Sequence, residues 1–266
     1  MKASVYDLDG NKKETIDIPP VFREAYKPFL IHKAVMAIQS HQFSTQGRDP
    51  FAGERTTAES WNTGRGVSRI SRVRGRRGGR SGMAAGVASV VKGRLPHPPK
   101  SEKEVSKHLN RRERRVALLS SISASMKREI VSRRGHQLPE GTPLPIVLSD
   151  DIESLGRTKD LKLTLNTLGL GDELARVSKA KRPSGKPKLR GRRAKTKRGP
   201  LIIVSEDSGI FKAAGKLTGV DCVLASNLSP IHLAPGGHPG RLVLWSKSAL
   251  NSLPRVLYSM VDRFAS

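Results

Sequence analysis

The chain has 266 residues, 36% of them hydrophobic, and its 49 Lys and Arg against 23 Asp and Glu give a formal net charge of +26. This length allows one large domain or two small ones, and the charge indicates nucleic acid or an anionic surface as the partner. The single cysteine, Cys222, excludes an intrachain disulfide and fits a reducing compartment, and no apolar run approaches the ~18 residues of a membrane span.

The N-terminal part of the chain predicts a hairpin followed by a helix. Residues 3–8 and 14–18 alternate in polarity around an Asp-Gly pair, which is typical of a β-hairpin. A helix is predicted from about residue 24 to residue 41, with its true start at Pro28, since proline is favoured in a first helical turn. Residues 42–60 are polar and interrupted by Gly and Pro, so we expect them outside the core.

Residues 60–101 then carry ten Lys or Arg, no Asp or Glu, and many glycines. Such a stretch lacks the apolar surface to offset an ordering entropy of roughly 1–2 kcal/mol per residue, so we expect it to be disordered until a polyanion binds. Going out and back, it could reach roughly 70 Å at about 3.3 Å per residue. The alternative interpretation is a merely solvated surface.

Structured RNA is the polyanion that this stretch fits best. Arginine forks bind phosphates in a bidentate manner, and Trp61 is the only aromatic residue there, so recognition of shape and phosphate is favoured over base stacking. The predicted RNA-binding residues of the stretch are Arg65, Arg69, Arg72, Arg74, Arg76, Arg77, Arg80, Lys92 and Arg94.

Helical periodicity returns after the basic stretch. Ser101 and Glu104 have the spacing of a capping box, and apolar residues three and four apart predict a long helix from Arg111 to Arg133. Beyond it, short apolar runs alternate with helical patterns. Strands are predicted at 144–149, 201–205, 220–225 and 242–245, and helices at 157–168, 209–217 and from Lys247 to about Phe264.

This order predicts an α/β fold: a three-layer α/β/α body with a mostly parallel sheet, plus a long basic extended internal loop. We expect residues 1–46 and 102–266 to form the body and residues 47–101 to form the loop. Within the body, residues 174–200 form a basic connection. Cys222 lies in a predicted strand, where a small buried side chain is expected.

The basic connection belongs to a second run, residues 174–205, that lacks any acid and carries +12. Since residues 60–101 carry +10, the rest of the chain has a net charge of only +4. This distribution describes a nearly neutral body with two cationic segments. The predicted RNA-binding residues of the second run are Lys186, Lys188, Arg190, Arg192, Arg193, Lys195, Lys197 and Arg198.

No pattern in the sequence predicts catalysis, a cofactor or a metal. The glycines of residues 209–217 have one residue too many between them for a phosphate loop, and the seven histidines show no metal spacing. Asp150, Asp151 and Glu153 could bind a metal or do acid–base work, but capping of the helix that follows explains them better. We therefore expect no catalytic residue, and the protein is predicted not to be an enzyme.

Several strings of the sequence together resemble the universal large-subunit ribosomal protein family L-four in its archaeal form. The chain stops shortly after its last predicted helix, without the long basic C-terminal tail of eukaryotic members, which also favours the archaeal form. The strings cover the chain in order: VYDLDGN at 5–11, ESWNTGRG at 59–66, VKGRLPHPPKSEKE at 91–104, RRGH at 133–136, VLSDDIESL at 147–155 and LAPGGHPGRL at 233–242.

The resemblance implies a structural constituent of the large ribosomal subunit in the cytoplasm, with an α/β/α body outside the subunit and a loop that threads the rRNA. Its partners would be large-subunit rRNA, neighbouring large-subunit ribosomal proteins and the nascent peptide, and no membrane. The loop tip would line the peptide exit tunnel, where family members bear on macrolide sensitivity, and some members repress their own messenger. By position, the tip comprises Arg72, Arg74, Gly75, Arg76 and Arg77.

Two other functions remain as alternatives on the sequence alone. The first is an RNA-binding regulator of a messenger, which would discriminate among RNAs by sequence. The second is an RNA-processing enzyme, which would need a cofactor loop or an acidic metal site that the sequence does not show. Neither explains why the first basic stretch is an internal loop with both ends in the body.

Overall fold

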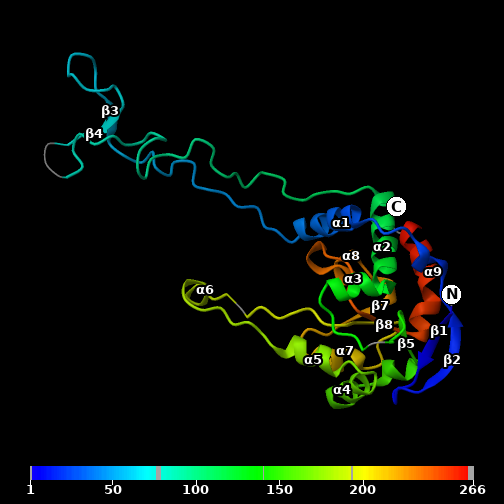
Figure 1. Ribbon diagram of the computed structural model, residues 1–266. Coiled ribbons are helices and arrows are strands. Elements are labelled where there is room, and N and C mark those ends of the chain that lie inside the picture. Colours follow the sequence, from blue (N-terminus) through cyan, green and yellow to red (C-terminus); the bar gives the residue numbers. More distant parts are fainter. Residues whose placement is uncertain (1, 76–78, 140, 193, 263–266) are drawn as a thin grey trace. The chain divides into compact units, whose positions relative to one another are not determined.

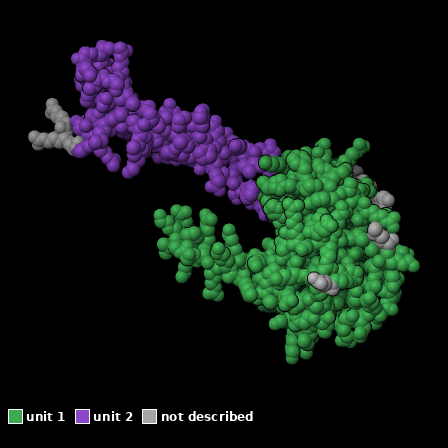
Figure 2. Space-filling model, in the orientation of Figure 1, with its two compact units in different colours: residues 1–39, 107–266 green, residues 40–106 purple. Residues whose placement is uncertain are grey.

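The structure is a computed structural model that describes residues 2–75, 79–139, 141–192 and 194–262 (Figure 1). The chain divides into two compact units, shown in green and purple in Figure 2. The first unit, called the body below, comprises Met1–Gln39 and Lys107–Ser266. The second unit, called the loop unit, comprises Ser40–Ser106.

A six-stranded sheet in the order β2-β1-β5-β8-β6-β7 forms the centre of the body. The N-terminal hairpin is antiparallel, as the sequence predicts, and every other pairing in the sheet is parallel. In the register of the inner strands, Ile202 pairs with Cys222 on one side and with Leu244 on the other. The strands are β1 (Lys2–Tyr6), β2 (Lys12–Asp17), β5 (Ile146–Leu148), β6 (Leu201–Val204), β7 (Asp221–Leu224) and β8 (Val243–Ser246).

Both faces of this sheet are covered by apolar side chains. Leu201 and Ile203 of β6 belong to one hydrophobic cluster, whereas Ile202 and Val204 belong to the other. The alternation arises because successive side chains of a strand point to opposite faces. Continuous apolar strands are thus buried on both sides, and the predicted three-layer α/β/α body is confirmed.

The helices divide between the two faces. The first face is covered by η1 (Pro20–Arg23), α2 (Arg111–Met126), η3 (Ala225–Asn227), α8 (Pro230–Leu233) and α9 (Lys247–Asp262). The second face is covered by α3 (Arg128–Arg133), η2 (Asp150–Ser154), α4 (Thr158–Thr167), α5 (Gly171–Ser178) and α7 (Ile210–Ala214). Helix α1 (Pro28–Ser40) starts at the predicted proline and packs Ile31 and Val35 against Ala234, which lies beside η4 (Pro235–Gly237).

Two sequence predictions about the middle of the chain are wrong. The predicted helix 111–133 breaks at Lys127, whose backbone is extended, because Ile122 packs on one face of the sheet and Val131 on the other. The predicted capping box does not start a helix, since residues 102–110 contain too few apolar side chains to bury a helical face. Glu104 instead accepts a hydrogen bond from Ser106 at 3.2 Å.

The acidic cluster after β5 also differs from its prediction. Its members lie within η2 and do not cap α4; Glu153 is buried and accepts hydrogen bonds from the Ser205 amide (2.8 Å) and the Ser246 hydroxyl (2.7 Å). Asp150 accepts one from the Ser248 amide (2.7 Å), in the first turn of α9. The carboxylates therefore join the ends of neighbouring strands, a relation that depends on strand order. Among the described residues, no cluster of His, Cys, Asp and Glu is placed to hold a metal ion.

The reactivity of the cysteine and the length of the helices also follow from the fold. Cys222 is only half-buried, on β7 against the second-face cluster, and burial raises the pKa of its thiol to about 12, so the thiol is inert at neutral pH. Across the described residues, every helix is too short or too polar to span a bilayer.

Candidate nucleic-acid interface

The loop unit contains two segments of chain that run beside each other. Strands β3 (Ala58–Ser60) and β4 (Ser71–Val73) form a small antiparallel sheet. The amide of Val73 donates to the Met83 carbonyl (2.9 Å), and the amide of Arg48 donates to the Pro99 carbonyl (3.1 Å). Hydrogen bonds thus join the outgoing and returning chain near both ends of the unit.

Trp61 is in contact with two of the predicted RNA-binding arginines. The guanidinium carbons of Arg65 and Arg72 lie 5.2 and 5.6 Å from its ring centroid, within the range of cation–π contacts. Arg72 also donates to the Gly82 carbonyl (2.9 Å) and the Ser68 hydroxyl (3.2 Å). These contacts hold the Arg72 side chain inside the loop unit.

The other predicted residues of the loop unit that the structure describes are exposed, with differing neighbours. Arg74 lies 3.3 Å from a carboxylate oxygen of Glu59, so part of its charge is neutralised within the unit. Arg76 and Arg77 lie outside the described residues. The remaining members, exposed and without an ion pair in the part of the chain that the structure describes, are Arg65, Arg69, Arg80, Lys92 and Arg94.

The basic connection leaves the body after α5 and returns to it at β6. The amides of Lys181 and Lys195 each donate to the other's carbonyl, at 3.0 and 2.9 Å, so the chain goes out and back as a narrow antiparallel segment. Its far part contains the short helix α6 (Lys186–Leu189). Arg193 lies outside the described residues, and the exposed predicted residues are Lys186, Lys188, Arg190, Arg192, Lys195, Lys197 and Arg198.

A buried cluster around Glu173 fixes the place where this connection leaves the body. The Glu173 side chain is fully buried, and Arg176 donates to both of its carboxylate oxygens, at 2.7 and 2.6 Å. Nδ1 of His136 lies 2.6 Å from Oε1, and the Gln137 amide donates to Oε2 (3.0 Å). Arg176 also donates to the Arg198 carbonyl (2.8 Å), so the cluster holds both ends of the connection.

The charges in this cluster follow from its contacts. Burial alone would raise the pKa of Glu173, but the hydrogen bonds from Arg176, His136 and the Gln137 amide outweigh it and lower the pKa to about 2. Burial lowers the pKa of His136, with Arg176 and Arg134 opposing a positive charge there. At neutral pH the pair is therefore a carboxylate and a neutral imidazole that donates from Nδ1.

Arg241 fixes the return of the connection to the sheet. Its side chain is 2% exposed, and its guanidinium lies 2.6 Å from Asp221 and donates to the Gly199 carbonyl at 2.8 Å. Arg198 lies 3.2 Å from the same carboxylate. A buried guanidinium with an ion pair and several carbonyl acceptors is well satisfied, so the start of β6 is held in place.

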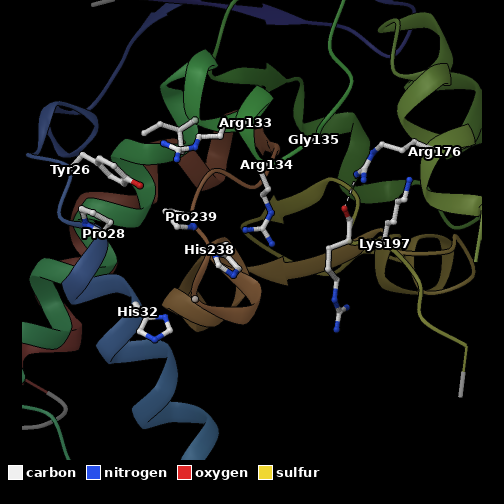
Figure 3. Close-up of a pocket in the computed structure, with 13 residues that line it drawn as sticks. Tyr26, Pro28, His32, Arg133, Arg134, Gly135, Arg176, Lys197, His238 and Pro239 are labelled. Atoms are coloured by element: carbon white, nitrogen blue, oxygen red, sulfur yellow. Dashed lines mark hydrogen bonds between the residues drawn. The ribbon is translucent and has the colours of Figure 1, made fainter. Parts of the chain in front are cut away.

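A pocket of about 970 Å³ opens where Arg176 and Arg198, which contact these anchors, line one side (Figure 3). Arg133 and Arg134 approach it from the end of α3, whereas Arg176 and Lys197 lie on another side. Tyr26, His32 and residues 237–239 also contribute to its lining. The pocket joins residues from four distant parts of the sequence.

Several residues of this region were absent from the sequence predictions. The pattern RRGH at 133–136 contains Arg133, Arg134 and His136, but nothing in the spacing pairs His136 with Glu173. Arg241, which is buried, was not singled out either. An arginine directly before an apolar run, such as Arg241 before LVLW, is the kind of signal that could indicate a buried ion pair.

Comparison with known proteins agrees with this architecture. Residues 16–256 match the sequence model of the ribosomal protein L4/L1 family. The chain is 40% identical to the large ribosomal subunit protein uL4 of Methanosphaera stadtmanae, over 95% of this chain and 96% of that one. It is 41% identical to the protein of the same name from Methanopyrus kandleri (95% and 98%) and 38% identical to that from Halorubrum lacusprofundi (95% and 99%).

Proposed function

Because the chain belongs to the ribosomal protein L4/L1 family, we propose that it is a structural constituent of the large ribosomal subunit that binds large-subunit rRNA through its two cationic segments. Its partners are rRNA and neighbouring ribosomal proteins, and its place is the cytoplasmic ribosome. None of the three relatives carries the name of an enzyme, which supports the expectation of a non-catalytic protein.

One contrast in the distribution of charge carries this proposal. Buried cations pair with carboxylates, as in Arg176 with Glu173 and Arg241 with Asp221. Most predicted cations of the two segments instead stand exposed without an ion pair in the described part of the chain. Uncompensated arginines and lysines on narrow segments repel one another until phosphates neutralise them, which favours deep insertion into folded RNA.

The finer proposal concerns the far end of the loop unit. Arg72 lies in β4 and Arg74 and Gly75 come directly after it. We assign Arg72, Arg74, Gly75, Arg76 and Arg77 to the wall of the peptide exit tunnel, beside the nascent peptide. Within this set, Arg74 and Gly75 are exposed, and Arg72 is held by its contacts with Trp61 and the Gly82 carbonyl. Arg74 is therefore the described side chain best placed to project from the tip.

Sedimentation of a cell lysate through a sucrose gradient in high salt tests the proposal. A constituent embedded in rRNA should remain at one copy per large subunit after a wash that strips peripheral factors. Recovery of the protein as free chains, or bound to one messenger, would overturn the structural assignment and favour a regulator. Turnover of RNA by the purified protein with Mg²⁺ would favour an enzyme.

A further inference from the structure

The pocket between α3 and the basic connection holds more positive charge than its surroundings neutralise. Glu173 and Asp221 offset the charges of Arg176 and Arg198. Arg133, Arg134 and Lys197 also line the pocket, and none of the three has an ion pair among the described residues. The lining that the structure describes contains no carboxylate.

Arg134 is the most informative of these cations. It donates from Nη2 to the Pro235 carbonyl (3.0 Å), whereas its Nη1 is buried and has no hydrogen-bond partner among the described residues. Burial, together with the charges of Arg241, Arg176 and Arg198, lowers the pKa of Arg134 to about 10. A buried donor on a cation, with three other cations near it, is costly unless an acceptor with negative charge fills the space beside it.

The 237–240 turn packs tightly against α1 and α3, so the pocket is a formed feature of the fold. A Cβ on Gly237 would lie 2.4 Å from Nδ1 of His32, and one on Gly240 would lie 2.7 Å from the Ile130 carbonyl oxygen. Both glycines have positive φ angles, 81° and 90°. The turn can approach α1 and α3 this closely only without side chains.

We propose that this pocket binds a short stretch of RNA backbone, with phosphates on Arg133 and Arg134 at one side and on Lys197 at the other, and a nucleoside against Tyr26 and Pro239. The volume of about 970 Å³ is far more than a lone phosphate needs and falls within the roughly 300–1,000 Å³ of pockets that enclose whole small molecules. Guanidinium forks match phosphate oxygens, and an aromatic ring beside them suits a base or sugar.

Continuity with the basic connection favours RNA over an acidic peptide. Lys195 and Lys197 lead from the far part of the connection to the rim of the pocket, so one RNA strand could follow both. The inference rests on the proposed function, because it places a further rRNA contact on the body. It adds a site, since Arg133, Arg134, Tyr26 and Pro239 lie in neither cationic segment.

A pair of double variants of the full-length protein tests the site. R133Q/K197Q removes two exposed charges that make no side-chain hydrogen bond in the described structure, so the fold should be retained. K159Q/K162Q removes two exposed charges from α4, none of whose residues lines the pocket, and is the matched control. The probe is a full-length large-subunit rRNA transcript, with the dissociation constant measured at several KCl concentrations and the RNA footprinted by hydroxyl radicals.

We expect the pocket variant to reduce the log–log salt slope by about 1.4 to 2, since each of the two lost phosphate contacts contributes about 0.7–1. It should also lose protection at one short RNA stretch, whereas the control keeps both slope and footprint.

Equal behaviour of the two variants, with tight binding by the unaltered protein, would overturn the pocket assignment alone. Failure of the unaltered protein to prefer rRNA over unrelated RNA would overturn the proposed function instead. Normal rRNA binding by the pocket variant, with loss of a protein neighbour from assembled subunits, would also overturn the pocket assignment, in favour of an acidic peptide.

Discussion

Oε1 of Glu173 on α5 lies 2.6 Å from Nδ1 of His136, the residue that follows Gly135 after α3. The two side chains are 0% and 1% exposed, and Arg176 completes the cluster. Through the Arg176 hydrogen bond to the Arg198 carbonyl, the same cluster fixes the basic connection. Stability of the body and presentation of a cationic segment are therefore coupled.

The first prediction concerns removal of the Glu173 charge. Glu173→Gln should destabilise the protein by about 3–5 kcal/mol, because it leaves Arg176 without a counter-ion in a buried position. Asp172→Asn, one residue away on the exposed side of α5, removes the same charge and should change stability by less than about 0.5 kcal/mol. Urea unfolding of both variants checks this, and similar losses in the two would contradict a special role for the buried cluster.

The second prediction concerns pH. His136 has a lowered pKa in the folded protein, so below its ordinary value of 6.5 the unfolded chain takes up a proton that the folded one does not, and stability falls. The pKa of Glu173 is about 2 in the folded protein, against an ordinary 4.5. Its contribution to the free energy of unfolding is therefore complete above pH 4.5 and is lost between pH 4.5 and about 2. That shift corresponds to about 3 kcal/mol.

Urea unfolding from pH 7 to pH 3 measures this dependence. The free energy of unfolding should decline in two steps, and the lower step should be absent from Glu173→Gln. A free energy that stays constant over the whole range would show that neither group changes protonation on unfolding.

The third prediction separates backbone conformation from close packing in the 236–240 turn. Gly236 and Gly240 both have positive φ angles, which cost an L-residue roughly 1–2 kcal/mol. A Cβ on Gly236 meets nothing nearer than 3.9 Å, whereas one on Gly240 meets Ile130 backbone at 2.7 Å. Gly240→Ala should therefore be less stable than Gly236→Ala by about a further 1–3 kcal/mol. Equal melting temperatures for the two variants would show that the turn moves aside freely.

The fourth prediction concerns the free cations of the loop unit. R80Q/R94Q removes two exposed charges without ion pairs in the described chain, and should lower the salt slope of rRNA binding by about 1.5 to 2. R48Q/R55Q removes two charges that lie beside Asp49, so its effect should be smaller. Filter binding at several salt concentrations gives both slopes, and a larger effect of the second variant would refute the assignment of unpaired cations to phosphates.

The fifth prediction concerns order in the free protein. Within residues 60–101, every residue that the structure describes is exposed or half-buried, so little apolar burial offsets the ordering entropy. Their amides should exchange within seconds in the isolated protein and become protected in the rRNA complex. The amides of β6 should be protected in both states and provide the internal control. Strong protection of residues 60–101 without RNA would contradict this expectation.

The sequence by itself determined the layers of the body and the location of its cationic segments. Apolar runs such as LIIVS at 201–205 need cover on both faces whatever their partners, and an acid-free run is cationic in any fold. The start of α1 at Pro28 could also be predicted from the sequence, because a proline restricts its own backbone. These properties depend on residues that are neighbours in the chain.

Only the tertiary structure decided the pairs that bridge distant residues. Glu173 meets His136, Arg241 meets Asp221, and Glu153 joins the ends of β6 and β8 because the strand order brings those segments together. The break at Lys127 has the same origin, since the residues on its two sides pack on opposite faces of one sheet. The pocket also depends on this order, because α3, the basic connection and the 237–239 turn converge only once the sheet is assembled.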